Sequence, residues 1–177
     1  MFEYGKYLSL SLPTPIMLHI FDNVCNLSII ENYKNKIFNH YNSMKLYNDP
    51  LEWYPTRNIT LNLNDPLIFF IKKYIETKIK VTTNCYQAEL QTWPVGEHSG
   101  LHRHEEFGRE QGDFNSLLYL NEDFEGGEFF TENGVTIKPK TNRLIFFNGK
   151  EIFHGVKKVV DKDRFTVIFW LKNTKFF

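Results

Sequence analysis

The spacing of hydrophobic and polar residues changes near residue 82. Before this point, two segments place apolar residues at intervals of three and four positions, which is the period of an amphipathic helix. After it, apolar and polar residues alternate, which is the period of a strand with one buried face. The pattern therefore predicts two helices followed by a segment made mainly of strands.

Both predicted helices have a recognisable start. Asp22 or Asn23 can cap the first helix, and Asp65 followed by Pro66 marks the start of the second. The apolar stripe of the first helix consists of Leu27, Ile30, Tyr33, Ile37 and Tyr41. The stripe of the second consists of Leu67, Phe70, Ile71, Tyr74, Ile75 and Ile79. We expect both helices to pack on one side of a sheet.

The other segments predict short strands and loops. Residues 1–20 suggest one or two strands interrupted by Pro13 and Pro15, and residues 42–63 show no sustained period and are predicted to be mostly loop and extended chain. From Thr82 a strand runs toward Pro94, and the segments 115–121, 128–131, 135–137, 143–148, 154–160 and 164–171 follow, with a turn at 123–127. Such strands predict a sandwich or barrel in a single domain over 1–177. Residues 1–81 would supply strands and supporting helices, and residues 82–177 the β core.

Composition narrows the function. The 177 residues carry 21 Lys and Arg against 21 Asp and Glu, so no net charge favours nucleic acid or acidic lipid as a partner. Cys25 and Cys85 lack metal-type spacing, which indicates free thiols in a reducing compartment. No apolar run suits a signal peptide or approaches the ~20 residues of a membrane span. We therefore expect a soluble, cytoplasmic protein.

Histidines and acids gather in one short stretch. The candidates are His98, His102, His104, Glu105 and Glu106. On an extended strand His104 and Glu106 point to one face and Glu105 to the other. If His154 joins them, two imidazoles and a carboxylate form the facial set typical of non-heme Fe(II) enzymes, with zinc as the alternative metal. A second possibility is a site of three histidines, His102, His104 and His154.

The β-rich half also resembles a known family. The motifs are Phe114-Asn115-Ser116-Leu117-Leu118-Tyr119-Leu120-Asn121, Gly126-Gly127-Glu128-Phe129, Ile137-Lys138-Pro139-Lys140, Arg143-Leu144-Ile145-Phe146-Phe147, His154-Gly155-Val156 and Arg164-Phe165-Thr166. In this order and spacing, over about residues 84 to 171, they resemble the prolyl 4-hydroxylase branch of the Fe(II)/2-oxoglutarate dioxygenases. The resemblance implies an α+β, mainly β fold: a double-stranded β-helix, or jelly roll, with N-terminal helices packed on one sheet.

The resemblance also implies roles for individual residues. It favours His104, Glu106 and His154 as metal ligands, with Glu106 where the prolyl hydroxylases have Asp. Arg164, ten residues after His154, would bind the distal carboxylate of 2-oxoglutarate with help from Tyr119 and Thr166. His104, Glu106, His154 and Arg164 would thus be the catalytic set. The implied cofactors are Fe(II), 2-oxoglutarate as cosubstrate and O2, with ascorbate as a supporting reductant.

The expected activity is hydroxylation of a substrate C–H bond with release of succinate and CO2. A prolyl residue of a protein or peptide is the expected substrate, because low net charge argues against nucleic acid. Two alternatives stay open at this point. One is a metal-binding or structural jelly roll without turnover, and the other is a dioxygenase that acts on a small molecule or a nucleobase.

Overall fold

The computed structural model describes residues 17–43, 45–49, 53–104 and 113–174. Two helices, α1 (Leu27–His40) and α2 (Pro66–Ile79), and a 3-10 turn, η1 (Tyr41–Ser43), accompany the strands. The strands are β1 (Leu18–Asp22), β2 (Lys45–Asp49), β3 (Trp53–Thr60), β4 (Thr83–Trp93), β5 (Ser99–His102), β6 (Phe114–Tyr119), β7 (Glu125–Gly126), β8 (Phe129–Thr131), β9 (Thr136–Ile137), β10 (Arg143–Phe147), β11 (His154–Val156), β12 (Val159–Val160) and β13 (Arg164–Asn173). The expectation of a mainly β chain with two helices is confirmed.

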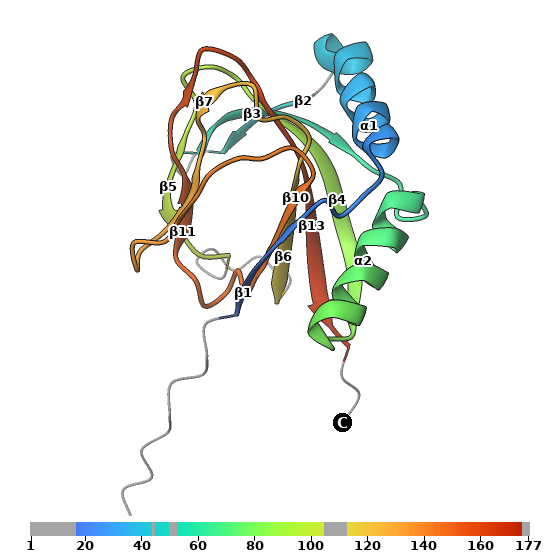
Figure 1. Ribbon diagram of the computed structural model, residues 1–177. Helices are drawn as coiled ribbons and strands as arrows, with labels where there is room; N and C mark the ends of the chain where they lie inside the picture. Colours follow the sequence, from blue (N-terminus) through green and yellow to red (C-terminus); the bar gives the residue numbers. More distant parts are fainter. Residues whose placement is uncertain (1–16, 44, 50–52, 105–112, 175–177) are drawn as a thin grey trace, which may run out of the picture.

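The strands form a large sheet and smaller sheets. The large sheet has seven strands in the order β1-β10-β6-β13-β4-β3-β2, and a four-stranded sheet has the order β5-β11-β8-β9. A two-stranded sheet pairs β12 with β7. The pairings given by strand register are all antiparallel (Figure 1). This is the predicted jelly roll, with the large sheet on one side and the small sheet on the other.

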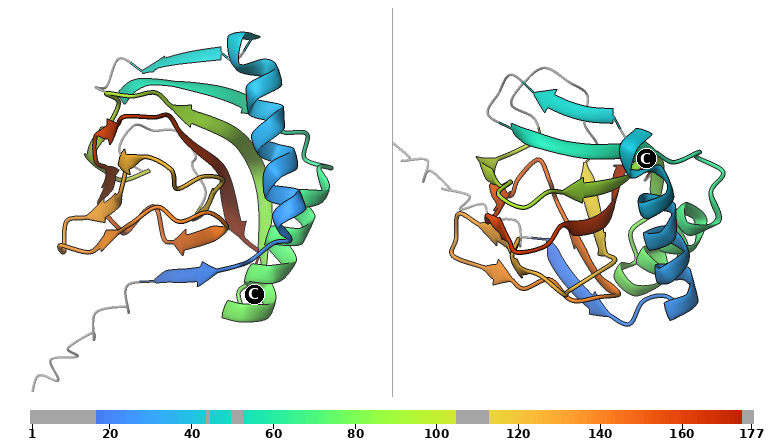
Figure 2. Two further views of the ribbon diagram at one scale, coloured as in Figure 1. Left: turned by 45° about the horizontal axis from the view of Figure 1, so that its top comes forward. Right: turned by 90° about the horizontal axis from the view of Figure 1, so that it is seen from above.

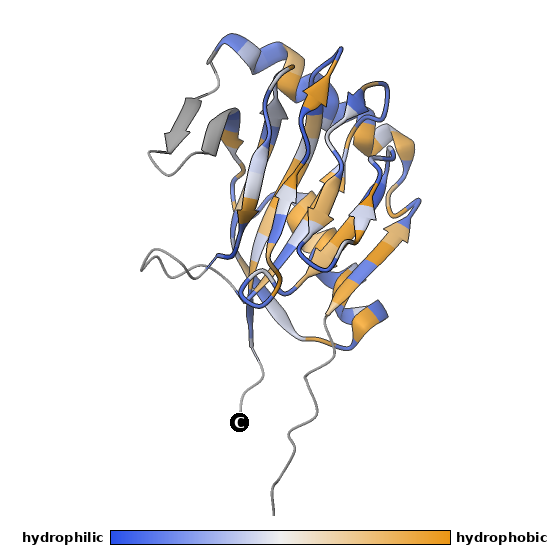
Figure 3. Cartoon of the chain, turned by 90° about the vertical axis from the view of Figure 1, so that its left-hand side faces the viewer, coloured by the Kyte–Doolittle hydropathy of each residue, from blue (hydrophilic) through white to orange (hydrophobic). Residues whose placement is uncertain are grey.

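Helices α1 and α2 cover the outer face of the large sheet, as predicted (Figure 2). Fully buried side chains of α1, such as Ile30 and Ile37, belong to one apolar cluster with Ala88 of β4 and Val167 of β13. A second cluster around Tyr119 lies between the two sheets. Strand β10 is buried on both faces, because Leu144 and Phe146 belong to the first cluster and Ile145 and Phe147 to the second. Apolar residues are accordingly frequent in the strands (Figure 3). No helix in the described part of the chain is long and apolar enough to cross a membrane.

The start of α2 follows the prediction, whereas the start of α1 does not. Asp65 caps α2, its carboxylate accepting a bond from the Leu67 N–H at 3.0 Å, with Pro66 in the first turn. For α1 the cap is Asn26, whose side chain accepts from the Ser28 N–H at 3.1 Å. The predicted cap at Asp22 or Asn23 is therefore wrong.

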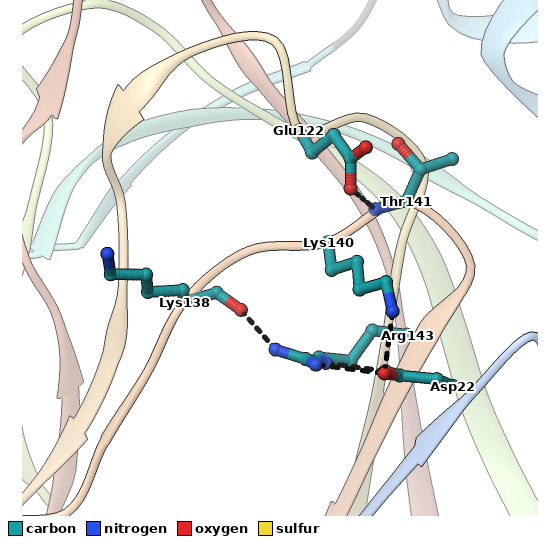
Figure 4. A network of polar contacts seen from close by, with 6 residues as sticks. All are labelled: Asp22, Glu122, Lys138, Lys140, Thr141 and Arg143. Atoms are coloured by element: carbon teal, nitrogen blue, oxygen red, sulfur yellow. Dashed lines mark hydrogen bonds and ion pairs between the residues drawn. The ribbon is translucent and has the colours of Figure 1, made fainter.

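Asp22 instead ends strand β1 and forms ion pairs with two cationic side chains. Its carboxylate accepts bonds from Arg143 Nε at 2.7 Å and from Lys140 Nζ at 2.8 Å (Figure 4). In the same network, the Arg143 guanidinium donates to the Lys138 carbonyl and the Thr141 N–H donates to Glu122. Asp22 also lies directly opposite Arg143 in the pairing of β1 with β10. The ion pair therefore fixes an edge strand to the turn that precedes β10.

The segment 42–63, the stretch around His104 and the N-terminal residues were also given predicted structures. The segment 42–63, predicted to be mostly loop and extended chain, contains strands β2 and β3. Ile59 lies opposite Leu90, so pairing with β4 supplies the order that the local sequence lacks. Strand β5 ends at His102, and His104 lies in a turn, so the extended conformation expected at His104 is not found. The strand expected within residues 1–16 lies outside the described residues.

Candidate metal and carboxylate site

Three histidines meet between the two sheets. His102 ends β5, His154 begins β11, and His104 lies in the turn after β5. One ligand nitrogen from each lies within 4.8 Å of the others. The ring centroid of His154 is 4.4 Å from that of His102 and 4.8 Å from that of His104. The described residues thus place three imidazoles close enough to share one metal ion.

All three imidazoles face an oxygen through Nδ1. His102 Nδ1 lies 2.9 Å from the Gly100 carbonyl and His154 Nδ1 lies 2.8 Å from the Ile152 carbonyl. His104 Nδ1 lies 2.6 Å from Asn115 Oδ1. Because these oxygens are acceptors, each ring holds its proton on Nδ1 and leaves the Nε2 lone pair for a metal. A histidine that binds metal through Nε2 needs this tautomer.

Burial keeps the two inner histidines neutral. Desolvation is the main cause that lowers the pKa of His104 to about 4, with His102 adding repulsion. Desolvation also lowers the pKa of His154 well below its ordinary value, and both neighbouring histidines contribute. The rings of Phe147 and Phe129 pack on His154 at centroid distances of 4.6 and 5.5 Å. Neutral imidazole is the form that binds metal, so this environment prepares the ligands near pH 7.

Arg164 lies in the same pocket as the histidines. The pocket is lined by Gln91, Trp93, Ser99, His102, His104, Leu117, Phe129, Phe147, His154, Val156, Arg164, Ile168 and Trp170. Arg164 begins β13 and has an exposed fraction of 0%. None of its three guanidinium nitrogens has a hydrogen-bond partner among the described residues. A buried cation of this kind calls for an anion that the described chain itself does not provide.

Two buried hydroxyl groups near Arg164 also lack hydrogen-bond partners among the described residues. The Tyr119 ring lies 5.0 Å from the Arg164 guanidinium carbon, and Thr166 is opposite Tyr119 in the pairing of β13 with β6. Both side chains are fully buried, and neither hydroxyl has a hydrogen-bond partner within the described residues. A carboxylate could accept from all three residues at once. The structure therefore brings together Arg164, Tyr119 and Thr166, and their role in binding 2-oxoglutarate stays a prediction.

The other candidates lie elsewhere or cannot be placed. Glu105 and Glu106 lie outside the described residues, so the choice of Glu106 as a ligand stays a prediction. His98 is not part of the histidine cluster. Asn115 belongs to one of the family motifs, but the sequence predicted no role for it. The signal was present, since Asn115, Leu117 and Tyr119 alternate on β6 and Tyr119 was already assigned to the site.

Comparison with known proteins agrees with this geometry. Residues 88–172 match the family model of the 2OG-Fe(II) oxygenase superfamily. Prolyl 3-hydroxylase 2 of Homo sapiens is 49% identical over 65 residues, covering 33% of this chain and 9% of that protein. The chain thus spans less than a tenth of the length of this curated relative.

Solved structures of prolyl hydroxylases share the fold. A Pseudomonas putida prolyl-4-hydroxylase superposes with a TM-score of 0.72 at 12% identity, covering 90% of this chain and 94% of that one. A Trichoplax adhaerens prolyl hydroxylase, in complex with a peptide fragment of the hypoxia inducible factor oxygen degradation domain, also gives 0.72, at 18% identity, covering 89% of this chain and 84% of that one. At these identities the likeness concerns the double-stranded β-helix fold alone.

Proposed function

We propose that this chain, whose residues 88–172 match the family model of the 2OG-Fe(II) oxygenase superfamily, hydroxylates a prolyl residue of a protein or peptide. The observation that carries the proposal is the fully buried guanidinium of Arg164, which has no hydrogen-bond partner among the described residues and lies in one pocket with three histidines. The positive charge of Arg164 suits a negatively charged dicarboxylate cosubstrate, and the three histidines suit coordination of a divalent metal. The names of the relatives support proline as the target.

The residues present fit both groups that the superfamily implies. We propose that His102, His104 and His154 hold Fe(II), because these are the ligands that the described residues bring together. Arg164, Tyr119 and Thr166 would hold the distal carboxylate of 2-oxoglutarate, since all three carry buried polar atoms without a partner among the described residues. Fe(II) with bound 2-oxoglutarate supplies the activation of O2, with succinate and CO2 as products.

The chain itself contributes orientation and exclusion of water. Arg164 would hold the cosubstrate at one end of the pocket, because its planar guanidinium can donate two parallel hydrogen bonds to a carboxylate. Phe129, Phe147 and Ile168 surround the histidines with apolar surface. Exclusion of water from the pocket strengthens these electrostatic contacts and limits side reactions. Trp93 and Trp170 also line the pocket and offer flat apolar surfaces for a pyrrolidine ring.

Cellular location follows from the cysteines. Cys25 and Cys85 are buried free thiols, and burial raises the pKa of both to about 11. Thiols of this kind suit a reducing compartment. We therefore place the protein in the cytoplasm as part of the proposal.

The decisive experiment measures succinate release by the iron-loaded protein with ascorbate present. Proline-containing peptides should stimulate release, matched peptides with alanine for proline should not, and mass spectrometry should find 16 Da added to the peptide, the mass of one oxygen atom. Amino-acid analysis then separates 3-hydroxyproline from 4-hydroxyproline. Stimulation by methylated single-stranded DNA, without stimulation by any peptide, would contradict the prolyl assignment. Absence of metal and 2-oxoglutarate binding would contradict the enzyme assignment as a whole.

A further inference from the structure

His104 is oriented differently from the other two histidines. His102 and His154 each face a backbone carbonyl two residues earlier in the chain, at Gly100 and Ile152. His104 instead faces a side chain, the amide oxygen of Asn115, eleven residues away on β6. Every residue type has a backbone carbonyl, whereas only Asn and Gln have an amide side chain. One of the three Nδ1 contacts therefore depends on a particular residue.

We propose that Asn115 is a positioning residue for the metal site, accepting the Nδ1 proton of His104 so that Nε2 is presented to the metal. The proposal rests on the histidine site proposed above. Asn115 does not contact the metal in this scheme. It selects one tautomer and one ring orientation of a ligand, and partners of this kind commonly change metal affinity 10- to 100-fold.

The orientation of the Asn115 amide matters for the tautomer. With Oδ1 toward His104, the ring holds its proton on Nδ1. With the amide reversed, the NH2 group would donate to Nδ1 and move the ring proton to Nε2, where it would block metal binding. The contact of 2.6 Å joins the oxygen to the ring, which corresponds to the binding tautomer.

The surroundings of Asn115 leave its side chain little freedom. Asn115 has an exposed fraction of 0% and lies on β6 opposite Phe147 of β10 and Trp170 of β13. Its Nδ2 has no hydrogen-bond partner within the described residues. An unpaired buried amide group lowers the stability of the fold. An apolar residue could fill the same space without an unpaired polar group. The presence of an amide at this position therefore indicates that its bond with His104 has a role.

Gly149 makes room for the pair. A Cβ atom at Gly149 would lie 2.8 Å from His104 Nδ1 and would also collide with Asn115 Oδ1. The Gly149 carbonyl accepts a bond from the His104 N–H at 3.0 Å. The backbone at Gly149 thus holds the main chain of His104 while Asn115 holds its ring. Lack of a side chain at Gly149 allows both contacts in one small space.

The test compares Co(II) affinity, followed through its visible absorption bands, in four proteins at pH 8. Asn115→Leu keeps the approximate size but removes the acceptor, and Asn115→Asp keeps the acceptor. Ser116→Ala is the matched control: Ser116 is the next residue on β6, is equally buried, and donates its hydroxyl to the Ile145 carbonyl at 3.2 Å. We expect Asn115→Leu to weaken Co(II) binding roughly 10- to 100-fold. Asn115→Asp and Ser116→Ala should stay within a few-fold of wild type.

Equal affinity of Asn115→Leu and wild type would overturn the proposal, and so would equal losses in Asn115→Leu and Asn115→Asp, which would indicate packing alone. A second measurement needs no variant. Long-range ¹H–¹⁵N NMR correlations of the metal-free wild type should show His104 with its proton on Nδ1, and a proton on Nε2 would refute the assignment even if Asn115→Leu fails to fold. Failure of the wild type to bind Co(II) would instead count against the proposed function, with the NMR result still deciding the role of Asn115.

Discussion

His154 lies directly opposite His102 in the antiparallel pairing of β11 with β5, and their rings are 4.4 Å apart. Strand register therefore brings these two imidazoles together, and a slip by one residue would turn one of them to the other face of the sheet. His104 is placed by other means, through its contacts with Gly149 and Asn115 in the turn after β5. Two of the proposed ligands therefore depend on the sheet, and the third depends on a turn.

The identity of the third ligand can be tested by two substitutions. If the site consists of His102, His104 and His154, then His102→Ala should lower Fe(II) affinity by more than the roughly 10- to 100-fold that loss of a partner outside the ligand shell costs. Glu106→Ala should leave it nearly unchanged. Anaerobic Fe(II) titration of both variants measures this. The reverse result would establish Glu106 as the carboxylate ligand that the sequence favoured.

Binding of 2-oxoglutarate should depend on Arg164. Arg164→Ala would leave the distal carboxylate buried without its partner, a loss of about 2 to 5 kcal/mol. Because each ~1.4 kcal/mol is tenfold in affinity, binding should weaken on the order of 30- to several thousand-fold. Arg164→Lys should fall between, since it keeps the charge but loses the forked geometry. Iron affinity should not change, and an unchanged 2-oxoglutarate affinity in Arg164→Ala would remove Arg164 from the site.

A glycine beneath Arg164 offers a more subtle test. Gly127 has a φ of +64°, and a Cβ atom there would lie 2.9 Å from Arg164 Cδ. Gly134 has a similar φ of +82° but has open space around it, which makes Gly134→Ala a matched control for backbone strain. Both alanine variants should lose about 1 kcal/mol or more of stability. Only Gly127→Ala should also weaken 2-oxoglutarate binding, measured by calorimetry, and equal binding by both variants would disprove the coupling.

The ion pairs of Asp22 predict a dependence of stability on pH. Hydrogen bonds from Arg143 and then Lys140 lower the pKa of Asp22 from 3.8 to about 2. A lowered pKa means that the stabilising contribution is present above pH 3.8 and is lost as the pH falls toward 2. Asp22→Asn should therefore reduce the free energy of unfolding at pH 7, by about 0.2 to 1 kcal/mol for each exposed pair. The difference from wild type should vanish near pH 2.

Urea denaturation at both pH values measures this difference. Asp123→Asn is the control, because Asp123 and Lys162 form a more exposed pair at 3.4 Å. Its effect should be small throughout. An Asp22→Asn effect that persists unchanged at pH 2 would show that packing, rather than charge, links β1 to β10.

The sequence predicted elements well where local signals determine them. Asp65 and Pro66 mark the start of α2, and that prediction was confirmed, whereas the cap of α1 is Asn26 and not the predicted Asp22 or Asn23. Strand β3 was missed because its order comes from pairing with β4, which no local pattern reveals. The same limit applies to the site: Arg164 and His154 were found through family motifs, whereas the position of His104 depends on contacts with residues 11 and 45 positions away, Asn115 and Gly149.

Strand β13 follows the other strands in the chain but lies near the middle of the large sheet, between β6 and β4. A ribosome synthesises the chain from the N-terminus, so β4 and β6 leave the exit tunnel before the strand that joins them exists. Until residue 164 and those after it emerge, the strand that pairs with both β4 and β6 is missing, so the large sheet cannot be continuous. Arg164 begins this joining strand, so one strand completes both the continuous sheet and the proposed anion-binding end of the pocket.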